Sequence, residues 1–157
     1  MSPEAYLQMP ETEASHWWYA GRRTALASLI AGLDLPVDAR ILEIGSGTGG
    51  NLPMLSSFGR VSALEMNATA RSIAERKTSG RFDIREGLCP AEIPFADEKF
   101  HLVCLFDVLE HIEEDVETLV AARNLLAQGG RVILTVPAYR WLWGVHDELL
   151  HHKRRYS

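Results

Sequence analysis

The sequence predicts an α/β fold, in which helices cover both faces of a parallel sheet. Short apolar runs alternate with segments of helical periodicity between Arg40 and Pro137. A glycine-rich loop follows the first of these runs, and glycine or proline punctuates the chain after several others. Such alternation is typical of right-handed βαβ crossovers, which build parallel sheets.

The apolar runs predict five strands. In chain order they are Arg40–Ile44, Arg60–Glu65, Arg81–Glu86, His101–Phe106 and Arg131–Pro137. Each run is short and rich in aliphatic or aromatic residues, which suits strands buried inside a sheet. The last run closes with a proline, which cannot donate a hydrogen bond to a neighbouring strand.

Helices are expected before and between these strands. The first runs from His16 to Leu33, because its apolar residues return about every 3.6 positions, and Ser15 is its expected N-cap. A short helix after the glycines has Pro53 in its first turn, where a missing N–H costs little. Asn67 is expected to cap a helix that stops near Gly80.

The last helix is predicted over DVETLVAARNLLAQ and is expected to end at the glycine pair 129–130. Its expected amphipathic face consists of Val116, Leu119, Val120, Arg123 and Leu126.

Composition excludes several classes of function. The chain has 157 residues, which favours one domain, and its formal net charge of -5 argues against binding to nucleic acid or anionic membranes. No apolar run approaches the ~20 residues of a membrane span, and the start of the chain lacks a signal-peptide pattern. Cys89 and Cys104 lack metal-ligand spacing, so we expect reduced thiols in a cytoplasmic protein and no metal site.

The glycine-rich loop, residues 45–50, predicts a ligand. In parallel sheets, ligands bind beyond the carboxyl ends of the strands, and glycine allows positive φ and close approach to the backbone. Gly45, Gly47 and Gly50 also match the dinucleotide fingerprint G-x-G-x-x-G. An NAD(P)-binding oxidoreductase is therefore one alternative at this point.

Two acids indicate a different ligand. Glu43 precedes Gly45 by two residues, so strand alternation places it near the ligand, where a carboxylate repels a pyrophosphate and attracts a cation. S-adenosylmethionine carries an ammonium and a sulfonium and no pyrophosphate. Glu65 ends the second predicted strand, about twenty residues beyond Gly45, an offset that suits hydrogen bonds to ribose hydroxyls.

The segment from Ile41 to Pro137 resembles class I S-adenosylmethionine-dependent methyltransferases, in particular the ubiquinone-biosynthesis-like group called type 11 or type 12. The stretches that carry the resemblance are ILEIGSGTGG, ALEMN, IPFADEKFHLV, FDVLEHI and NLLAQGGRVILTVP. The resemblance implies a Rossmann-like, doubly wound parallel sheet of strand order 3-2-1-4-5 with an N-terminal lid helix. It also implies the cofactor S-adenosyl-L-methionine and methyl transfer to a small-molecule acceptor by in-line displacement.

The resemblance also implies a set of cofactor-binding residues: Arg22, Glu43, Gly45, Ser46, Gly47, Glu65, Met66, Leu88, Cys89 and Phe106. Glu43 would hold the amino group, Glu65 the ribose, and Met66 would lie against the adenine. At the position that reads the adenine edge, the family often has aspartate, whereas this chain has Leu88 or Cys89.

Further roles concern arginine, from the resemblance, and histidine, from its chemistry and its place after the strands. Arg22 on the lid helix would pair with the methionine carboxylate, because its planar fork matches a carboxylate. His111, after the fourth strand, is the first candidate for a general base, and His146 is the second, although a structural role for each stays open. The basic cluster at residues 151–155 either holds an anionic substrate group or is a solvated run of charge.

We expect a single methyltransferase domain over residues 1–157. It divides into an N-terminal lid and helix (1–38), a cofactor-binding core (39–137) and the start of a substrate-side region (138–157). The family sheet normally has seven strands, so we expect either that the chain is truncated or that another chain completes its sheet. We also expect it to self-associate through the edge of strand five or through Trp141–Trp143. A cofactor-binding protein that is inactive or depends on a partner is a further alternative.

Overall fold

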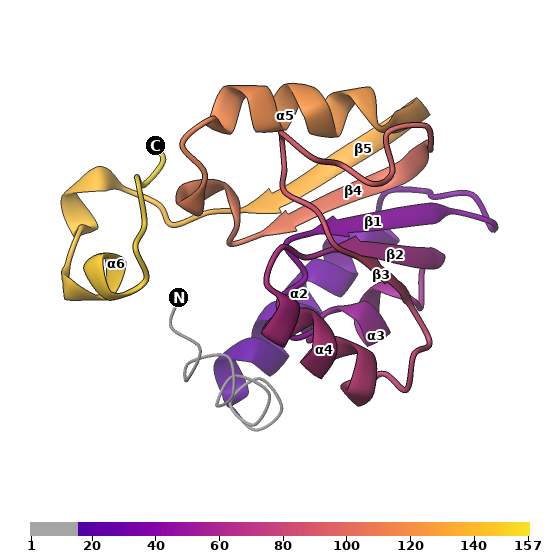
Figure 1. Ribbon diagram of the computed structural model, residues 1–157, viewed down its shortest axis with the longest axis horizontal. Helices are drawn as coiled ribbons and strands as arrows, with labels where there is room; N and C mark the ends of the chain where they lie inside the picture. The colour runs from indigo at the N-terminus through magenta and orange to yellow at the C-terminus, as the bar shows by residue number, and fades with distance from the viewer. Residues whose placement is uncertain (1–15) are drawn as a thin grey trace.

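The computed structural model describes residues 16–157, and its centre is a five-stranded parallel sheet (Figure 1). The strands are β1 (Arg40–Ile44), β2 (Arg60–Leu64), β3 (Asp83–Arg85), β4 (Phe100–Phe106) and β5 (Leu126–Thr135). Their order in the sheet is β3-β2-β1-β4-β5, and every neighbouring pair is parallel. The predicted fold class and strand order are confirmed.

Helices cover both faces of the sheet. The helix α5 (Asp115–Asn124) lies on one face, and α2 (Trp17–Ala31), α3 (Leu52–Leu55) and α4 (Ala68–Lys77) lie on the other (Figure 1). Successive residues of a strand point to opposite faces, so Ile41 packs in the core under α2, α3 and α4, and its neighbour Leu42 packs in the core under α5. The central strands are therefore buried on both sides, which explains their continuous apolar runs.

Local capping explains where the helices begin. The ring nitrogen Nδ1 of His16 accepts a hydrogen bond from the Trp18 N–H at 3.3 Å and caps α2, whereas the expected cap, Ser15, lies outside the described residues. Asn67 caps α4 as predicted, with Oδ1 accepting from the Ala70 N–H at 2.9 Å. Among the described residues, no helix combines the length and the apolar composition that crossing a bilayer requires.

The boundary between α5 and β5 differs from the prediction. The helix ends at Asn124 and β5 begins at Leu126, so the expectation that the helix continues to the glycine pair 129–130 is wrong. The register between β4 and β5 shifts just after Phe100, and Gly129 has a φ of +75° at this irregularity. The glycines therefore serve a bulge in the strand and do not end the helix.

The buried face of α5 also differs from the predicted amphipathic face. Thr118 and Ala122 are buried against the sheet, whereas Val116, Leu119 and Val120 are exposed. Small side chains let the helix backbone approach the sheet closely. The apolar stripe that the sequence shows most clearly therefore lies on the outer surface of α5.

The C-terminal segment, residues 138–157, lies beyond the carboxyl ends of β4 and β5 (Figure 1). It contains the short helices η2 (Arg140–Leu142) and α6 (Val145–Leu149). An isolated parallel bridge joins Ala138 to Tyr156, so the segment returns to its own starting point. β5 is the last strand in the sheet order, so one of its edges has no strand partner among the described residues.

We expect the chain to self-associate through the β5 edge or through Trp141–Trp143, because Trp141 is 78% exposed and an open strand edge can pair with another chain. Light scattering over a concentration series should give an average mass that rises above the monomer's 17.5 kDa. Trp141→Ser should lower the association, and Trp17→Ser, at an exposed tryptophan of α2, should not. A strictly monomeric chain at high concentration would contradict this expectation.

Candidate functional site

The loop after β1, residues 45–50, combines positive φ angles with tight packing. Gly45 and Gly47 have φ values of +71° and +54°. A Cβ atom at Gly45 would lie 2.6 Å from Cγ2 of Val108. A residue larger than glycine would therefore overlap the Val108 side chain. A Cβ atom at Gly47 would meet no atom of the described residues within 4 Å. The backbone at Gly47 is thus open to a ligand.

The carboxylate of Glu65 joins this loop to the end of β2. Its Oε2 accepts a hydrogen bond from the Gly47 N–H and its Oε1 accepts one from the Asn67 N–H, both at 2.8 Å. Glu65 is only 4% exposed, whereas the next residue, Met66, is 62% exposed. An acidic group and an apolar side chain therefore lie side by side next to the glycines.

Glu43 lies at the carboxyl end of β1, where strand alternation places it. It is 1% exposed, and its Oε1 accepts a hydrogen bond from Nδ2 of Asn51 at 2.8 Å. It lies opposite Cys104 of β4 in the sheet register. Burial raises the pKa of the Cys104 thiol well above its usual value, and the charge of Glu43 raises it further. Negative charge is thus concentrated under the glycine loop.

Three other residues assigned from the sequence differ in their exposure. Ser46 is buried, and its Oγ has no hydrogen-bond partner within residues 16–157. Leu88, in the loop after β3, is 43% exposed and exchanges two backbone hydrogen bonds with Glu92. Cys89 packs in the core under α5, and burial raises its pKa. Of the two adenine-edge candidates, only Leu88 presents its side chain to solvent.

Arg22 connects the N-terminal helix to the ends of β4 and β5. Its Nη2 donates to Oδ2 of Asp107 at 2.7 Å and to Oγ1 of Thr135 at 2.8 Å. Its guanidinium also lies 5.9 Å from the ring centroid of Phe106. Asp107 has a φ of +55°, a strained conformation for a residue with a side chain. Sequence reasoning missed Asp107 and Thr135, whose only signal was their place at strand ends.

The basic cluster at residues 151–155 is organised by a buried acid. Asp147 is fully buried and accepts hydrogen bonds from Nε and Nη2 of Arg155 at 2.7 and 2.9 Å. It also accepts one from the Gly144 N–H and contacts Nδ1 of His152, each at 2.9 Å. The hydrogen bonds from Arg155, above all, hold the pKa of Asp147 well below its usual value. The carboxylate is therefore ionised, and Nδ1 of His152 donates to it.

The other charges of the cluster also have acidic neighbours. Arg154 forms an ion pair with Asp115 at 2.8 Å, and Lys153 lies 3.7 Å from Glu113. The Lys153 N–H donates to the carbonyl oxygen of Glu110 at 2.7 Å, which attaches the segment to the chain after β4. The cluster is thus largely neutralised by the protein itself. Because its charges are paired with acids, the cluster is neither an unoccupied site for an anionic substrate group nor a set of side chains surrounded only by solvent.

A second group of titratable side chains lies where the C-terminal segment meets η1 (Leu109–His111). The ring centroids of His111 and His152 are 4.8 Å apart. Burial, followed by the charge of His152, lowers the pKa of His111 to about 4. Burial raises the pKa of Glu110 to about 7, and its Oε2 has no hydrogen-bond partner among the described residues. Sequence reasoning selected only His111 from this group.

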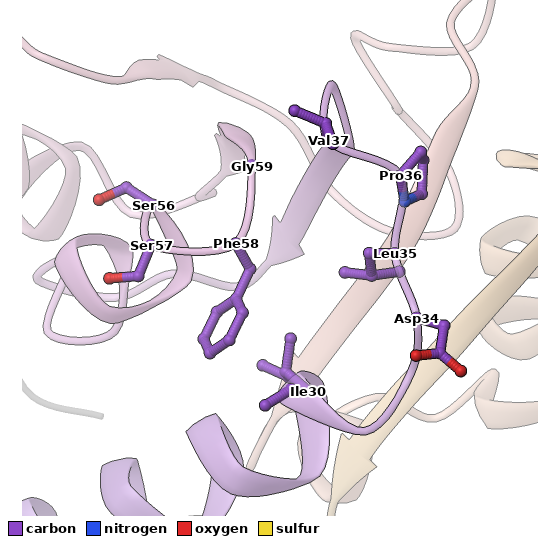
Figure 2. Close-up of a pocket in the computed structure, with 10 residues that line it drawn as sticks. Ile30, Asp34, Leu35, Pro36, Val37, Ser56, Ser57, Phe58 and Gly59 are labelled. Atoms are coloured by element: carbon purple, nitrogen blue, oxygen red, sulfur yellow. The ribbon is translucent and has the colours of Figure 1, made fainter.

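A surface hollow lies apart from the glycine loop and from the group around Glu110. It is lined by the end of α2, residues 34–37 and residues 56–59, with Ile30 and Phe58 facing it (Figure 2). These segments precede β1 and β2, so the hollow lies at the amino ends of the strands. The glycine loop and the two buried glutamates lie at the opposite edge of the sheet.

A family model described as a methyltransferase domain matches residues 17–156. A solved protein of Bacillus halodurans, described as a candidate methyltransferase, superposes with a TM-score of 0.72 at 21% identity, covering 85% of this chain and 63% of its own. A glycopeptide N-methyltransferase, MtfA, solved in complex with (S)-adenosyl-L-methionine, gives 0.63 at 22% identity, covering 74% and 55%.

A curated relative shares more sequence over a shorter stretch. A highly reducing polyketide synthase, PKS2 of Leptosphaeria maculans, is 32% identical over 119 residues, which are 64% of this chain and 5% of that protein. This chain therefore spans a small part of the curated relative and less than two thirds of the two solved structures.

Gly45→Ala should lower the free energy of unfolding by about 2–4 kcal/mol, because alanine strains at positive φ and its Cβ overlaps Val108. In the double variant Gly45→Ala/Val108→Ala, the overlap is removed and only the backbone strain remains. Urea denaturation of the parent, both single variants and the double variant should therefore reveal a favourable coupling of about 1 kcal/mol. Strictly additive costs would show that Val108 does not impose glycine here.

Proposed function

This chain belongs to the methyltransferase-domain family, and from that membership we propose that it transfers a methyl group from S-adenosyl-L-methionine to a small-molecule acceptor by in-line displacement. One observation carries the proposal: the open backbone at Gly47 donates its N–H to the buried carboxylate of Glu65, and the buried Glu43 lies at the end of the strand that leads into the same loop. The buried Ser46 hydroxyl, which has no hydrogen-bond partner among the described residues, adds a donor to this place. These groups fit a ligand that is cationic at one end and carries hydroxyls.

We assign the polar contacts to the acids. The charge of Glu43 favours the ligand's ammonium, because a buried carboxylate binds a cation more strongly than one in water. Each carboxylate oxygen accepts more than one hydrogen bond, so Glu65 can receive ribose hydroxyls while it keeps the Gly47 and Asn67 N–H groups. The exposed side chains of Met66 and Leu88 offer apolar surface for the adenine ring.

We assign the methionine end to the loop and to α2. Gly45 and Gly47 allow the ligand to approach the backbone, and Phe106 supplies an apolar wall beside it. A guanidinium has five N–H donors, so Arg22 can pair with a ligand carboxylate while it keeps its contact to Asp107. In this proposal α2 acts as a lid, residues 39–137 as the cofactor-binding core and residues 138–157 as part of the acceptor side.

The chain's part in the chemistry is mainly positional. The cofactor, when bound, supplies a methyl group on a positively charged sulfur. The protein aligns the acceptor and excludes water, which is worth up to ~7–11 kcal/mol. His111 as a general base stays a prediction: its pKa of about 4 leaves the ring neutral at pH 7, but makes it a weak base.

The other functions left open by the sequence receive less support. A pyrophosphate-containing dinucleotide would meet the buried charge of Glu43 close to the loop, which disfavours an NAD(P)-dependent oxidoreductase. A protein that binds the cofactor but needs a partner for turnover remains an outcome of the test below. We place the protein in the cytoplasm because Cys89 and Cys104 are both free thiols.

Calorimetric titrations with S-adenosylhomocysteine and with NADH test the proposal directly. Heat with the first ligand and none with the second is expected. Binding of NADH alone would overturn the proposal. A methylation assay with a panel of small hydroxylated and amino acceptors then separates an active enzyme from a protein that only binds the cofactor.

Glu65→Ala should weaken S-adenosylmethionine binding by roughly 1.5–3 kcal/mol, because hydrogen bonds to a charged acceptor are lost. Glu75→Ala is the matched control, since Glu75 is exposed on α4. Calorimetry gives both affinities, and circular dichroism checks that each variant is folded. Unchanged affinity in folded Glu65→Ala would remove this residue from the site.

Glu43→Gln should also weaken S-adenosylmethionine binding, because it keeps the shape and removes the charge that a cationic ligand needs. The same change should leave any residual affinity for NADH unchanged or higher, since a dinucleotide gains nothing from the carboxylate. Titration of both ligands into the parent and the variant measures the difference. Equal S-adenosylmethionine affinities would show that the charge of Glu43 is not used.

A further inference from the structure

Two histidines and one glutamate converge where residues 138–157 meet the chain after β4. One ligand atom from each of Glu110, His111 and His152 lies within 4.8 Å of the other two. In a tetrahedral zinc site with bonds of about 2.1 Å, ligand atoms are about 3.4 Å apart, so modest side-chain rotations would close the group around an ion. Two imidazoles with one carboxylate is a known donor set for zinc.

Both imidazoles are held in the manner of metal ligands. Nδ1 of His152 lies 2.9 Å from Oδ1 of the buried Asp147, so a carboxylate orients this ring. A ring nitrogen of His111 is hydrogen-bonded to the backbone of His151, so the other ring nitrogen is left to bind a metal ion. Metal-binding histidines usually donate their second N–H to a carboxylate or a backbone carbonyl in this way.

Glu110 supplies an independent observation. It is 1% exposed, and its buried Oε2 has no hydrogen-bond partner among residues 16–157. A buried carboxyl oxygen without a partner costs free energy, and a cation at this place would remove that cost. The guanidinium of Arg22, on the neighbouring helix α2, pairs with Asp107 at 2.7 Å. Oε2 of Glu110 is therefore a buried ligand atom with no hydrogen-bond partner among the described residues.

We propose that Glu110, His111 and His152 form a binding site for one divalent transition-metal ion of the zinc type. The two nitrogen donors disfavour Mg²⁺ and Ca²⁺, which prefer oxygen ligands. Three protein ligands leave a fourth position for water or an acceptor oxygen. The ion ties the C-terminal segment to η1. Its binding does not depend on the proposed methyl transfer, and a metal-bound His111 does not act as a general base.

The test is a Zn²⁺ titration of the untagged chain against a chromophoric chelator. The parent should bind about one Zn²⁺ per chain, and His111→Ala and His152→Ala should each lower the affinity at least about tenfold. His151→Ala is the matched control, since its side chain is exposed and lies outside the group. Equal affinity in the parent and both ligand variants, or an equal loss in His151→Ala, would overturn the site.

Two further measurements cover variants that do not fold. Glu110→Gln keeps the side-chain shape and should also lower Zn²⁺ affinity, with circular dichroism as the check on folding. Co²⁺ added to the parent should give the intense visible absorption of a four-coordinate ion. The weak spectrum of hydrated Co²⁺ alone would overturn the proposal without any variant. Mg²⁺ should not compete with Co²⁺ at millimolar concentration, and full competition would contradict the proposed donor set.

Discussion

One carboxylate positions the candidate cofactor site. Glu65 accepts the N–H groups of Gly47 and Asn67, so the loop after β1 and the loop after β2 are fixed to the same side chain. Because the carboxylate is almost fully buried, these hydrogen bonds act where water competes little. The glycine loop is thereby preorganised without a bound ligand. The placement of Glu43 under the loop and of Met66 beside it follows from the same two strands.

Most of the fold could be predicted because burial of the central strands leaves an unmistakable pattern. β1 has the predicted bounds, and β2 and β4 differ from theirs by one residue, since each is an apolar run bounded by polar residues or glycine. The region after Asn124 could not be predicted in the same way. Its glycines suit the end of a helix or a bulge equally well, and only the register with β4 decides between them. The prediction of which face of α5 is buried was wrong because small residues face the sheet, and small residues give no periodic apolar signal.

The candidate site was predicted less evenly. Residues next to strand ends, such as Glu43 and Glu65, were found because their position follows from strand alternation. The partners of Arg22 were missed because Thr135 is 113 residues away in the sequence. The group around Glu110 was missed for the same reason: no spacing motif connects it to His152, and only the return of the C-terminal segment brings them together. Long-range pairs of this kind leave no local pattern.

The attachment of residues 138–157 has a consequence for the motions of the chain. The segment is closed internally through Asp147, whereas its attachment to the rest of the domain uses the Lys153 N–H, the ion pair between Arg154 and Asp115, and the Tyr156 hydroxyl. Val145 and Leu149 of α6 are about 70% exposed, so apolar burial adds little to the attachment. A segment with strong internal contacts that is attached to the domain mainly by polar contacts is expected to detach from the domain as one unit. Its amides should exchange with solvent together, and faster as ionic strength rises.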